Sequence, residues 1–155
     1  MAKLNIGDIT LTGSGALQGR VAFAAHQNGS GSGNNTSDGI QVYQTETLDT
    51  HNAYNNGTGI FTVPVTGVYF FYAQLMGNAN DARSAHYISK STNGGSSWSF
   101  LVQFGGQAKQ YNQFSTHVIA PLNVNDQVAV KNSDYASNLY TNCNQEAVFG
   151  GYLIG

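Results

Sequence analysis

Side chains that could do acid–base or metal chemistry are few in this chain of 155 residues. The carboxylates are Asp8, Asp38, Glu46, Asp49, Asp81, Asp126, Asp134 and Glu146, and the histidines are His26, His51, His86 and His117. No two carboxylates have the spacing of a local general acid and base, and the histidines form neither an HxH nor an HxxxH pair. The GxSxG turn that presents a nucleophilic serine is absent as well. The sequence therefore predicts a protein that is not an enzyme.

Two oxygen-rich segments are candidates for a calcium site. Asn78, Asn80 and Asp81 stand close together, and Asp134 lies in the segment NSDYASN at 132–138. Calcium binds through carboxylate, amide and carbonyl oxygens of this kind. The EF-hand pattern is absent, however, and hydrogen bonds within ordinary polar turns explain these residues better than a metal does. We predict no cofactor, and we name Asp81 and Asp134 as the ligands if calcium binds.

The composition excludes several classes of partner. Charged residues make up 9% of the chain, against about 25% in a usual soluble domain. The six Lys and Arg residues are scattered rather than gathered in a basic stripe, so nucleic acid is not an expected partner. No apolar run approaches the roughly 18 residues of a membrane span, and residues 1–15 lack the apolar core of a secretion signal.

The pattern of apolar residues predicts an all-β fold of about nine or ten strands with no helix. Short segments rich in β-branched and aromatic residues alternate with turns rich in Gly, Asn and Ser, which is typical of a β-sandwich or jelly roll. The expected strands are 21–25, 40–44, 59–64, 68–76, 84–91, 98–104, 112–122, 127–132 and 146–154, with a loop at 28–39, a connector at 45–57 and turns at 93–97 and 105–109. We expect one domain at 19–155, preceded by an arm at 1–18 in which Ile6, Ile9 and Leu11 are the apolar points.

The expected strands 68–76 and 146–154 are apolar on both faces. Successive side chains of a strand point to opposite faces, and a strand of a two-layer sandwich normally buries one face and exposes the other. In the segment VYFFYA at 68–73, both alternating sets are apolar or aromatic. Because no helix is expected to cover the second face, we predict that another copy of the same chain covers it.

The segment GIFTVPVTGVYFF at 59–71 resembles the signature of the globular C1q domain, in the C1q and tumour-necrosis-factor superfamily. The matching residues are Gly59, Phe61, Pro64, Gly67, Tyr69 and Phe71. Further segments resemble this family: RVAFAA at 20–25, Asn52 to Tyr54, NDQVAV at 125–130, where Asn125 replaces a glycine, and a closing strand with Phe149, Gly151 and Leu153. The resemblance covers residues 20–155.

This resemblance implies a jelly roll of ten strands that assembles as a homotrimer. The signature residues and the closing-strand residues Phe149, Gly151 and Leu153 would then form the core and the trimer interface. Pro64 suits the end of a strand, where its missing N–H is harmless. Gly67 suits a tight turn that requires a positive φ.

We therefore predict a trimeric structural or adhesive knob on a phage particle, either a capsid decoration protein or a fibre head. The arm at 1–18 would bind capsid or tail proteins, and the virion surface is the expected location. The alternative is a secreted, extracellular recognition module that binds a cell-surface glycan or a protein, with or without calcium. Its binding loops would present Tyr111, Tyr135 and Tyr140, because tyrosine beside Asn and Ser forms adaptable contacts. The third hypothesis is a hydrolase whose catalytic residues are distant in the sequence and come together only in the folded chain.

Overall fold

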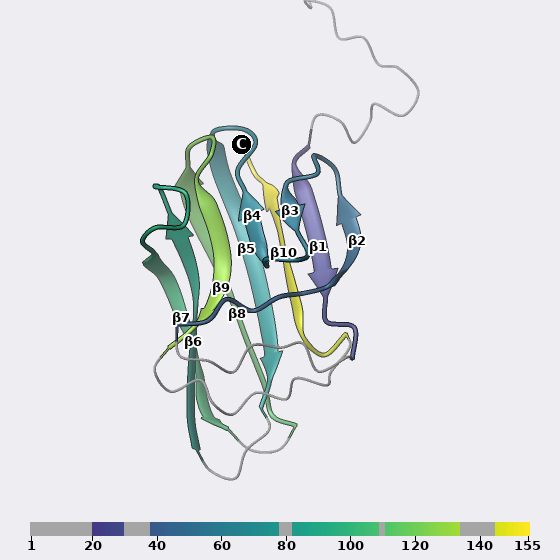
Figure 1. Ribbon diagram of the computed structural model, residues 1–155, viewed down its shortest axis with the longest axis vertical. Coiled ribbons are helices and arrows are strands. Elements are labelled where there is room, and N and C mark those ends of the chain that lie inside the picture. Colours follow the sequence, from purple (N-terminus) through teal and green to yellow (C-terminus); the bar gives the residue numbers. More distant parts are fainter. Residues whose placement is uncertain (1–19, 30–37, 78–81, 109–110, 134–144) are drawn as a thin grey trace, which may run out of the picture.

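Two antiparallel five-stranded sheets make up the domain in a computed structural model that describes residues 20–29, 38–77, 82–108, 111–133 and 145–155. Sheet A has the strand order β2-β1-β10-β5-β8, and sheet B has the order β3-β4-β9-β6-β7 (Figure 1). The strands are β1 (Ala22–His26), β2 (Thr45–Asp49), β3 (Tyr54–Asn55), β4 (Ile60–Thr62), β5 (Gly67–Met76), β6 (Ala82–Ser91), β7 (Ser99–Ala108), β8 (Gln113–Leu122), β9 (Gln127–Asn132) and β10 (Val148–Leu153). The described residues contain no helix, which confirms the predicted all-β fold.

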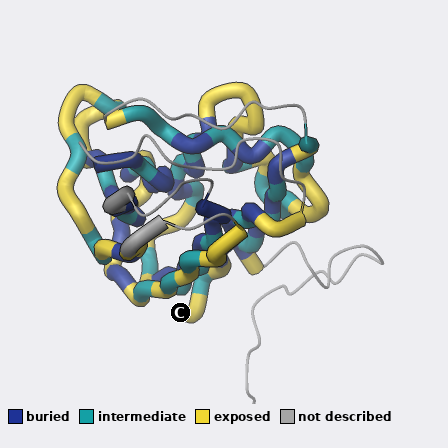
Figure 2. The backbone as a smooth tube through the Cα atoms, turned by 90° about the horizontal axis from the view of Figure 1, so that it is seen from below, coloured by how far each residue is buried: buried dark blue, intermediate teal, exposed yellow. Residues whose placement is uncertain are grey.

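Strand β5 determines how sheet A divides core from surface. It pairs with β10 on one side and with β8 along its full length on the other. Its odd-numbered residues Tyr69, Phe71 and Leu75 are buried between the sheets, whereas Phe70 and Tyr72 point to the opposite face and are half-buried. Figure 2 shows the buried stretches running through the middle of the molecule, with exposed backbone mainly in the loops.

The core between the sheets is a cluster of aromatic rings. Phe23 of β1 stacks on Phe61 of β4 with ring centroids 4.5 Å apart, and it meets the edge of Phe149 of β10 at 5.0 Å. Phe71 lies 5.8 Å from Phe61 and 6.2 Å from Phe149. Edge-to-face and offset stacked pairs of this kind add to the stabilisation from burial alone. The rings come from both sheets, so they hold the two layers together.

Three parts of the strand prediction are wrong. The expected strand 40–44 forms only an isolated bridge, between Ile40 and Lys131, because this segment crosses from sheet B to sheet A (Figure 1). The segment still buries alternate residues, Gln41 and Tyr43. Because it crosses between the sheets, it does not run alongside a neighbouring strand with which it could form a ladder. The strand that pairs with β1 is β2, which lies in the expected connector 45–57, and β7 continues through the expected turn at 105–109 as far as Ala108.

The role of Gly67 at the start of β5 also differs from expectation. Gly67 does not adopt a positive φ. It is needed because a Cβ there would lie 2.5 Å from Leu153 Cδ1 and 2.9 Å from the carbonyl oxygen of Gly155. Positive φ occurs instead at Gly59, with φ 76°, and at Asn125, with φ 70°. Asn tolerates this left-handed region better than most residues, which explains how Asn125 stands where the C1q pattern has glycine.

The predicted arm at 1–18 lies outside the described residues, so its attachment residues Ile6, Ile9 and Leu11 have no structural account. The part of the chain that the structure describes contains no candidate for a membrane-spanning helix.

Candidate functional site

The signature residues lie in the core rather than on a surface. Phe61, Tyr69, Phe71 and Phe149 are almost fully buried, Gly151 packs beneath Phe71, and Leu153 is half-buried against the core. The Tyr69 hydroxyl donates a 2.6 Å hydrogen bond to the Val65 carbonyl, and burial raises the pKa of this hydroxyl, against the effect of the hydrogen bond. Pro64 lies two residues after Thr62, the last residue of β4, just beyond the backbone hydrogen bonds that Val63 makes. Surface function must therefore come from the residues that alternate with these.

The outer face of sheet A carries an aromatic and aliphatic surface, which we call the sheet A face. It is formed by Val68, Phe70 and Tyr72 of β5, His117 and Ile119 of β8, and Tyr152 of β10. Ile119 is 61% exposed, Tyr152 is 49% exposed and Val68 is 38% exposed. The Phe70 ring lies 5.2 Å from that of Tyr152 and 5.8 Å from that of His117, centroid to centroid. Three adjacent strands thus present one continuous apolar band.

Two hollows extend the sheet A face toward its β2 edge. One of about 160 Å³ lies over Ala24 and Gly150, a pair of small residues in register on β1 and β10, with Tyr72 at its side. The other, of about 580 Å³, is lined by Leu48, Tyr152 and Ile154 among others. The sheet A face therefore has bulky side chains beside hollows that lie over small residues. A second surface of complementary shape can pack closely against it.

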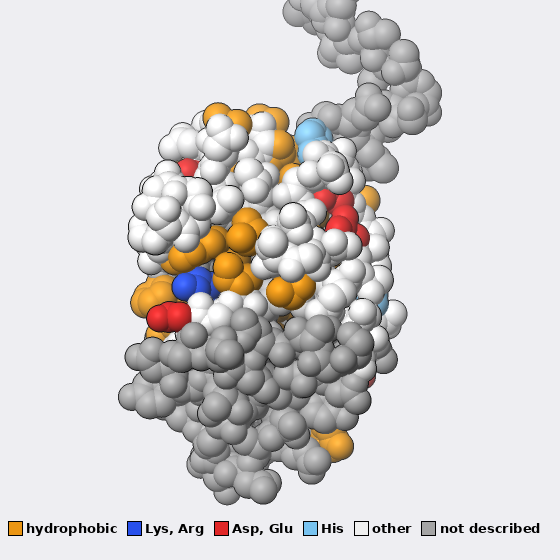
Figure 3. Space-filling model, in the orientation of Figure 1, with side chains coloured by type: hydrophobic (Ala, Val, Ile, Leu, Met, Phe, Trp, Pro, Cys, Tyr) orange, Lys and Arg blue, Asp and Glu red, His pale blue; other side chains and the backbone are white. Residues whose placement is uncertain are grey.

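The outer face of sheet B is more mixed. Phe100 is exposed and stacks on Tyr87 with ring centroids 3.8 Å apart. Lys131 Nζ lies 5.7 Å from the centroid of the Trp98 ring and 3.9 Å from Asp38 Oδ1. Figure 3 shows apolar side chains on this side of the molecule next to basic and acidic groups and uncharged polar surface. With this mixture of charged, polar and apolar groups, the outer face of sheet B can remain exposed to solvent.

One group of side chains is hydrogen-bonded in the order serine, histidine, amide, as in the active site of a hydrolase. The group is buried, however, so it cannot act on a substrate. Ser84 Oγ lies 2.6 Å from His86 Nε2, and His86 Nδ1 lies 3.2 Å from Asn132 Oδ1, which also accepts a 2.7 Å hydrogen bond from Gln41 Nε2. All four residues are at most 1% exposed. A substrate cannot reach a serine in this position, so the group is a structural polar network between the sheets. The sequence indicated it only through Ser84 and His86, which share a face of one strand.

This network makes the stability of the protein sensitive to acid. Burial lowers the pKa of His86 to about 4 from 6.5, against the opposing hydrogen bond to Asn132. Between these values the unfolded chain binds a proton that the folded chain does not, so stability is full above about pH 6.5 and falls as the pH drops toward 4. We expect this group to lower the free energy of unfolding by about 2 kcal/mol between pH 7 and pH 5.

The variant His86→Gln tests this expectation, because glutamine can keep hydrogen bonds to Ser84 and Asn132 without titrating. Urea unfolding at pH 7 and pH 5 should show a pH dependence smaller than that of the unmodified chain by about 2 kcal/mol. The other histidines are present in both proteins and cancel. An equal pH dependence in the two proteins would show that His86 does not titrate in this range.

The predicted ligand residues are mostly not described. Asp81, Asp134, Tyr135 and Tyr140 lie outside the described residues, so the calcium site and two of the three binding tyrosines stay predictions. Tyr111 is described, and it is 58% exposed at the turn before β8. Within the described ranges, no three His, Cys, Asp or Glu side chains gather as a metal site would require.

Comparison with known proteins agrees with this architecture. Residues 22–154 match the C1q domain family. Similar solved structures include the globular domain of zebrafish complement 1qA protein (18% identity, 87% of this chain and 98% of that chain, TM-score 0.65) and murine APRIL (17%, 87% and 99%, 0.66). Eiger TNF from S. frugiperda is also similar (16%, 88% and 93%, TM-score 0.72).

The matching family also indicates the kind of function, assembly and location that its members have. Members of the C1q and TNF family are non-enzymatic recognition or signalling modules, which agrees with the prediction that the chain is not an enzyme. Their domains generally form trimeric binding modules and are typically extracellular or secreted.

Proposed function

Because this chain belongs to the C1q domain family, we propose that it is the knob of a non-enzymatic homotrimer, joined through the sheet A face. The observation that carries the proposal is the apolar band of Phe70, Ile119 and Tyr152 on the outer face of that sheet. Contiguous aromatic and aliphatic surface of this kind marks an interaction site on a soluble protein. Each chain of the trimer would contribute this band to an interface with its neighbour, around a closed threefold axis.

In this arrangement sheet B and the adjoining loops face outward and form the adhesive surface. We place the trimer on a phage virion, as a capsid decoration protein or fibre head, with residues 1–18 attached to capsid or tail proteins. The composition supports this placement, because 9% charged residues give a polar, nearly uncharged surface and the single cysteine requires no oxidising compartment.

The second candidate is a secreted recognition module for a glycan or a protein. The usual extracellular location of the family favours it. Calcium held by Asp81 and Asp134 would belong to this function, and chelation would then abolish binding while leaving a virion knob unaffected.

A matched pair of substitutions tests the trimer. Ile119 on the sheet A face and Phe100 on the outer face of sheet B are each 61% exposed in the single chain. We expect Ile119→Lys to give a folded monomer, because burying three unpaired ammonium groups in the interface costs about 3–5 kcal/mol or more. Phe100→Lys should remain a trimer. Sedimentation velocity gives the masses, and circular dichroism confirms that both variants are folded.

Two results would contradict the proposal. A trimer that survives Ile119→Lys would place the interface elsewhere. Dissociation by both substitutions would show that the outer face of sheet B also contacts the neighbouring copy.

A further inference from the structure

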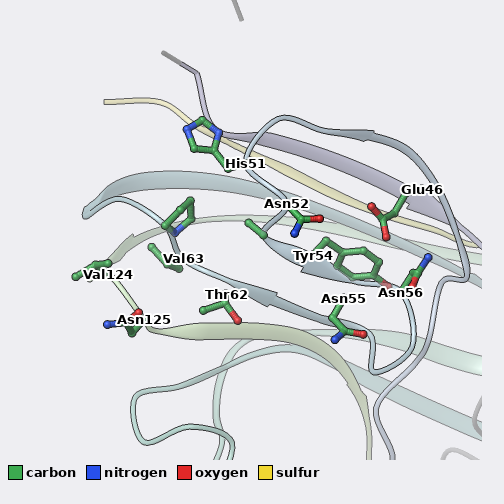
Figure 4. Close-up of a pocket in the computed structure, with 12 residues that line it drawn as sticks. Glu46, His51, Asn52, Tyr54, Asn55, Asn56, Thr62, Val63, Val124 and Asn125 are labelled. Carbon is green, nitrogen blue, oxygen red and sulfur yellow. The ribbon is translucent and has the colours of Figure 1, made fainter. Parts of the chain in front are cut away.

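A third concave surface lies at the end of the sandwich where β4 leads into β5. It is a hollow of about 590 Å³ between the β2–β3 connection, the end of β4 and the β8–β9 turn. Figure 4 shows Asn52 and Glu46 on one side of this groove, and Thr62 and Asn125 on the other. The volume falls within the range of small-molecule sites. This groove is built by one chain, and it is separate from the sheet A face.

Hydrogen bonds from the backbone fix the walls of the groove. Asp49 accepts bonds from the backbone N–H groups of His51, at 3.1 Å, and Tyr54, at 2.8 Å, which hold the β2–β3 connection in place. On the opposite wall, the N–H of Asn125 donates to the Val63 carbonyl at 2.9 Å. A groove whose walls are already ordered loses little entropy when a ligand binds.

The polar groups of the groove are available to a ligand. Asn52, with φ 50°, and Asn125, with φ 70°, both adopt the left-handed backbone conformation and are exposed. Among the described residues, nothing hydrogen-bonds the side-chain amides of these two residues, the Glu46 carboxylate or the Thr62 hydroxyl. Each amide offers one acceptor and two N–H donors. The groove therefore presents mixed donors and acceptors from four separate segments.

We infer that this groove binds a neutral carbohydrate. The ligand would be a short glycan carried on the surface to which the trimer attaches. Sugar hydroxyls both donate and accept hydrogen bonds, as the two amides and Thr62 require. The half-exposed Val124 and the adjoining Pro64 provide apolar contact for the C–H face of a sugar ring. The described residues that line the groove include no Lys or Arg, and Glu46 would repel an anionic ligand. A peptide is less suited, because the polar groups do not follow one strand edge.

The inference goes beyond the proposed trimer and can be tested independently of it. The experiment titrates the ¹⁵N-labelled full chain with methyl α-mannoside, lactose and chitotriose, and follows amide chemical shifts by NMR. Sialyllactose and an uncharged peptide of glycine and serine serve as the anionic and peptide probes. We expect a neutral sugar to give saturable shifts in the amides of residues 51–55, 62–63 and 124–125. The shifts should persist in Ile119→Lys, so loss of the trimer would leave this result intact.

Substitutions identify the polar contacts. Asn52→Asp and Asn125→Asp keep the shape of the side chain and tolerate a positive φ, but remove two N–H donors. Each should weaken sugar binding about tenfold. Asn112→Asp makes the same change at the opposite end of β8 and should have no effect. If either variant fails to fold, Thr62→Val removes a hydroxyl from the same groove without changing its shape.

Three outcomes would overturn the inference. The first is that no neutral sugar shifts the groove amides at tens of millimolar. The second is that sialyllactose or the peptide binds there as well as the neutral sugars. The third is that the aspartate variants and Thr62→Val bind like the unmodified chain.

Discussion

Replacing Phe71 by Ala should lower the free energy of unfolding by about 3–5 kcal/mol. The Phe71 side chain is fully buried and contacts rings from both layers, namely Phe23, Phe61, Tyr69 and Phe149. Its removal loses the burial of a whole ring and leaves a cavity between rigid neighbours that cannot close over it. Urea unfolding, monitored by tyrosine and tryptophan fluorescence, measures the change.

Phe100→Ala is the matched control, because it removes the same ring from a site that is 61% exposed. Its effect should stay within about 1 kcal/mol, since only one stacked contact with Tyr87 is lost. Equal effects of the two substitutions would contradict the assignment of the odd-numbered residues of β5 to the core.

Replacing Gly151 by Ala should cost about 1–3 kcal/mol or more, although it adds a single methyl group. A Cβ at Gly151 would lie 2.5 Å from Phe71 Cδ1 and 2.8 Å from the carbonyl oxygen of Phe70. The ring can shift, but the carbonyl belongs to the paired strand β5 and cannot move without breaking the register between β10 and β5. Thermal unfolding by calorimetry would show this loss as a lower Tm.

Gly106→Ala is the control for this substitution. Gly106 also lies within a strand, and the nearest contact of a Cβ there would be Phe114 Cε1 at 3.5 Å, an ordinary van der Waals distance. This variant should match or slightly exceed the stability of the unmodified chain, because alanine restricts the unfolded state more than glycine does. If Gly151→Ala were equally harmless, the close packing of β10 on β5 would be wrong.

The sequence was sufficient to predict the fold class because the evidence for it is local. Alternation in β1, β5 and β8 to β10 shows which residues share a face, and the spacing of Gly59, Pro64 and Gly67 identifies the family. The structure then adds what alternation leaves open: of the two apolar faces of β5, the one with Tyr69 and Phe71 is the core. The remaining face is the one predicted to need a neighbouring copy.

The errors and omissions come from features that depend on distant residues. The segment 40–44 has a strand pattern, but its path between the sheets is set by where β1 and β9 lie. The requirement for glycine at 67 comes from Leu153 and Gly155, which are far along the chain. The groove brings Asn52 together with Asn125, and in an Asn-rich sequence neither residue stands out.

Sedimentation equilibrium of the unmodified protein tests whether a second copy of the chain covers the sheet A face. We predict a single species with three times the chain mass of 16.5 kDa across the micromolar concentration range. A monomer over the same range would contradict the proposed trimer, because Phe70, Ile119 and Tyr152 would then remain in contact with water.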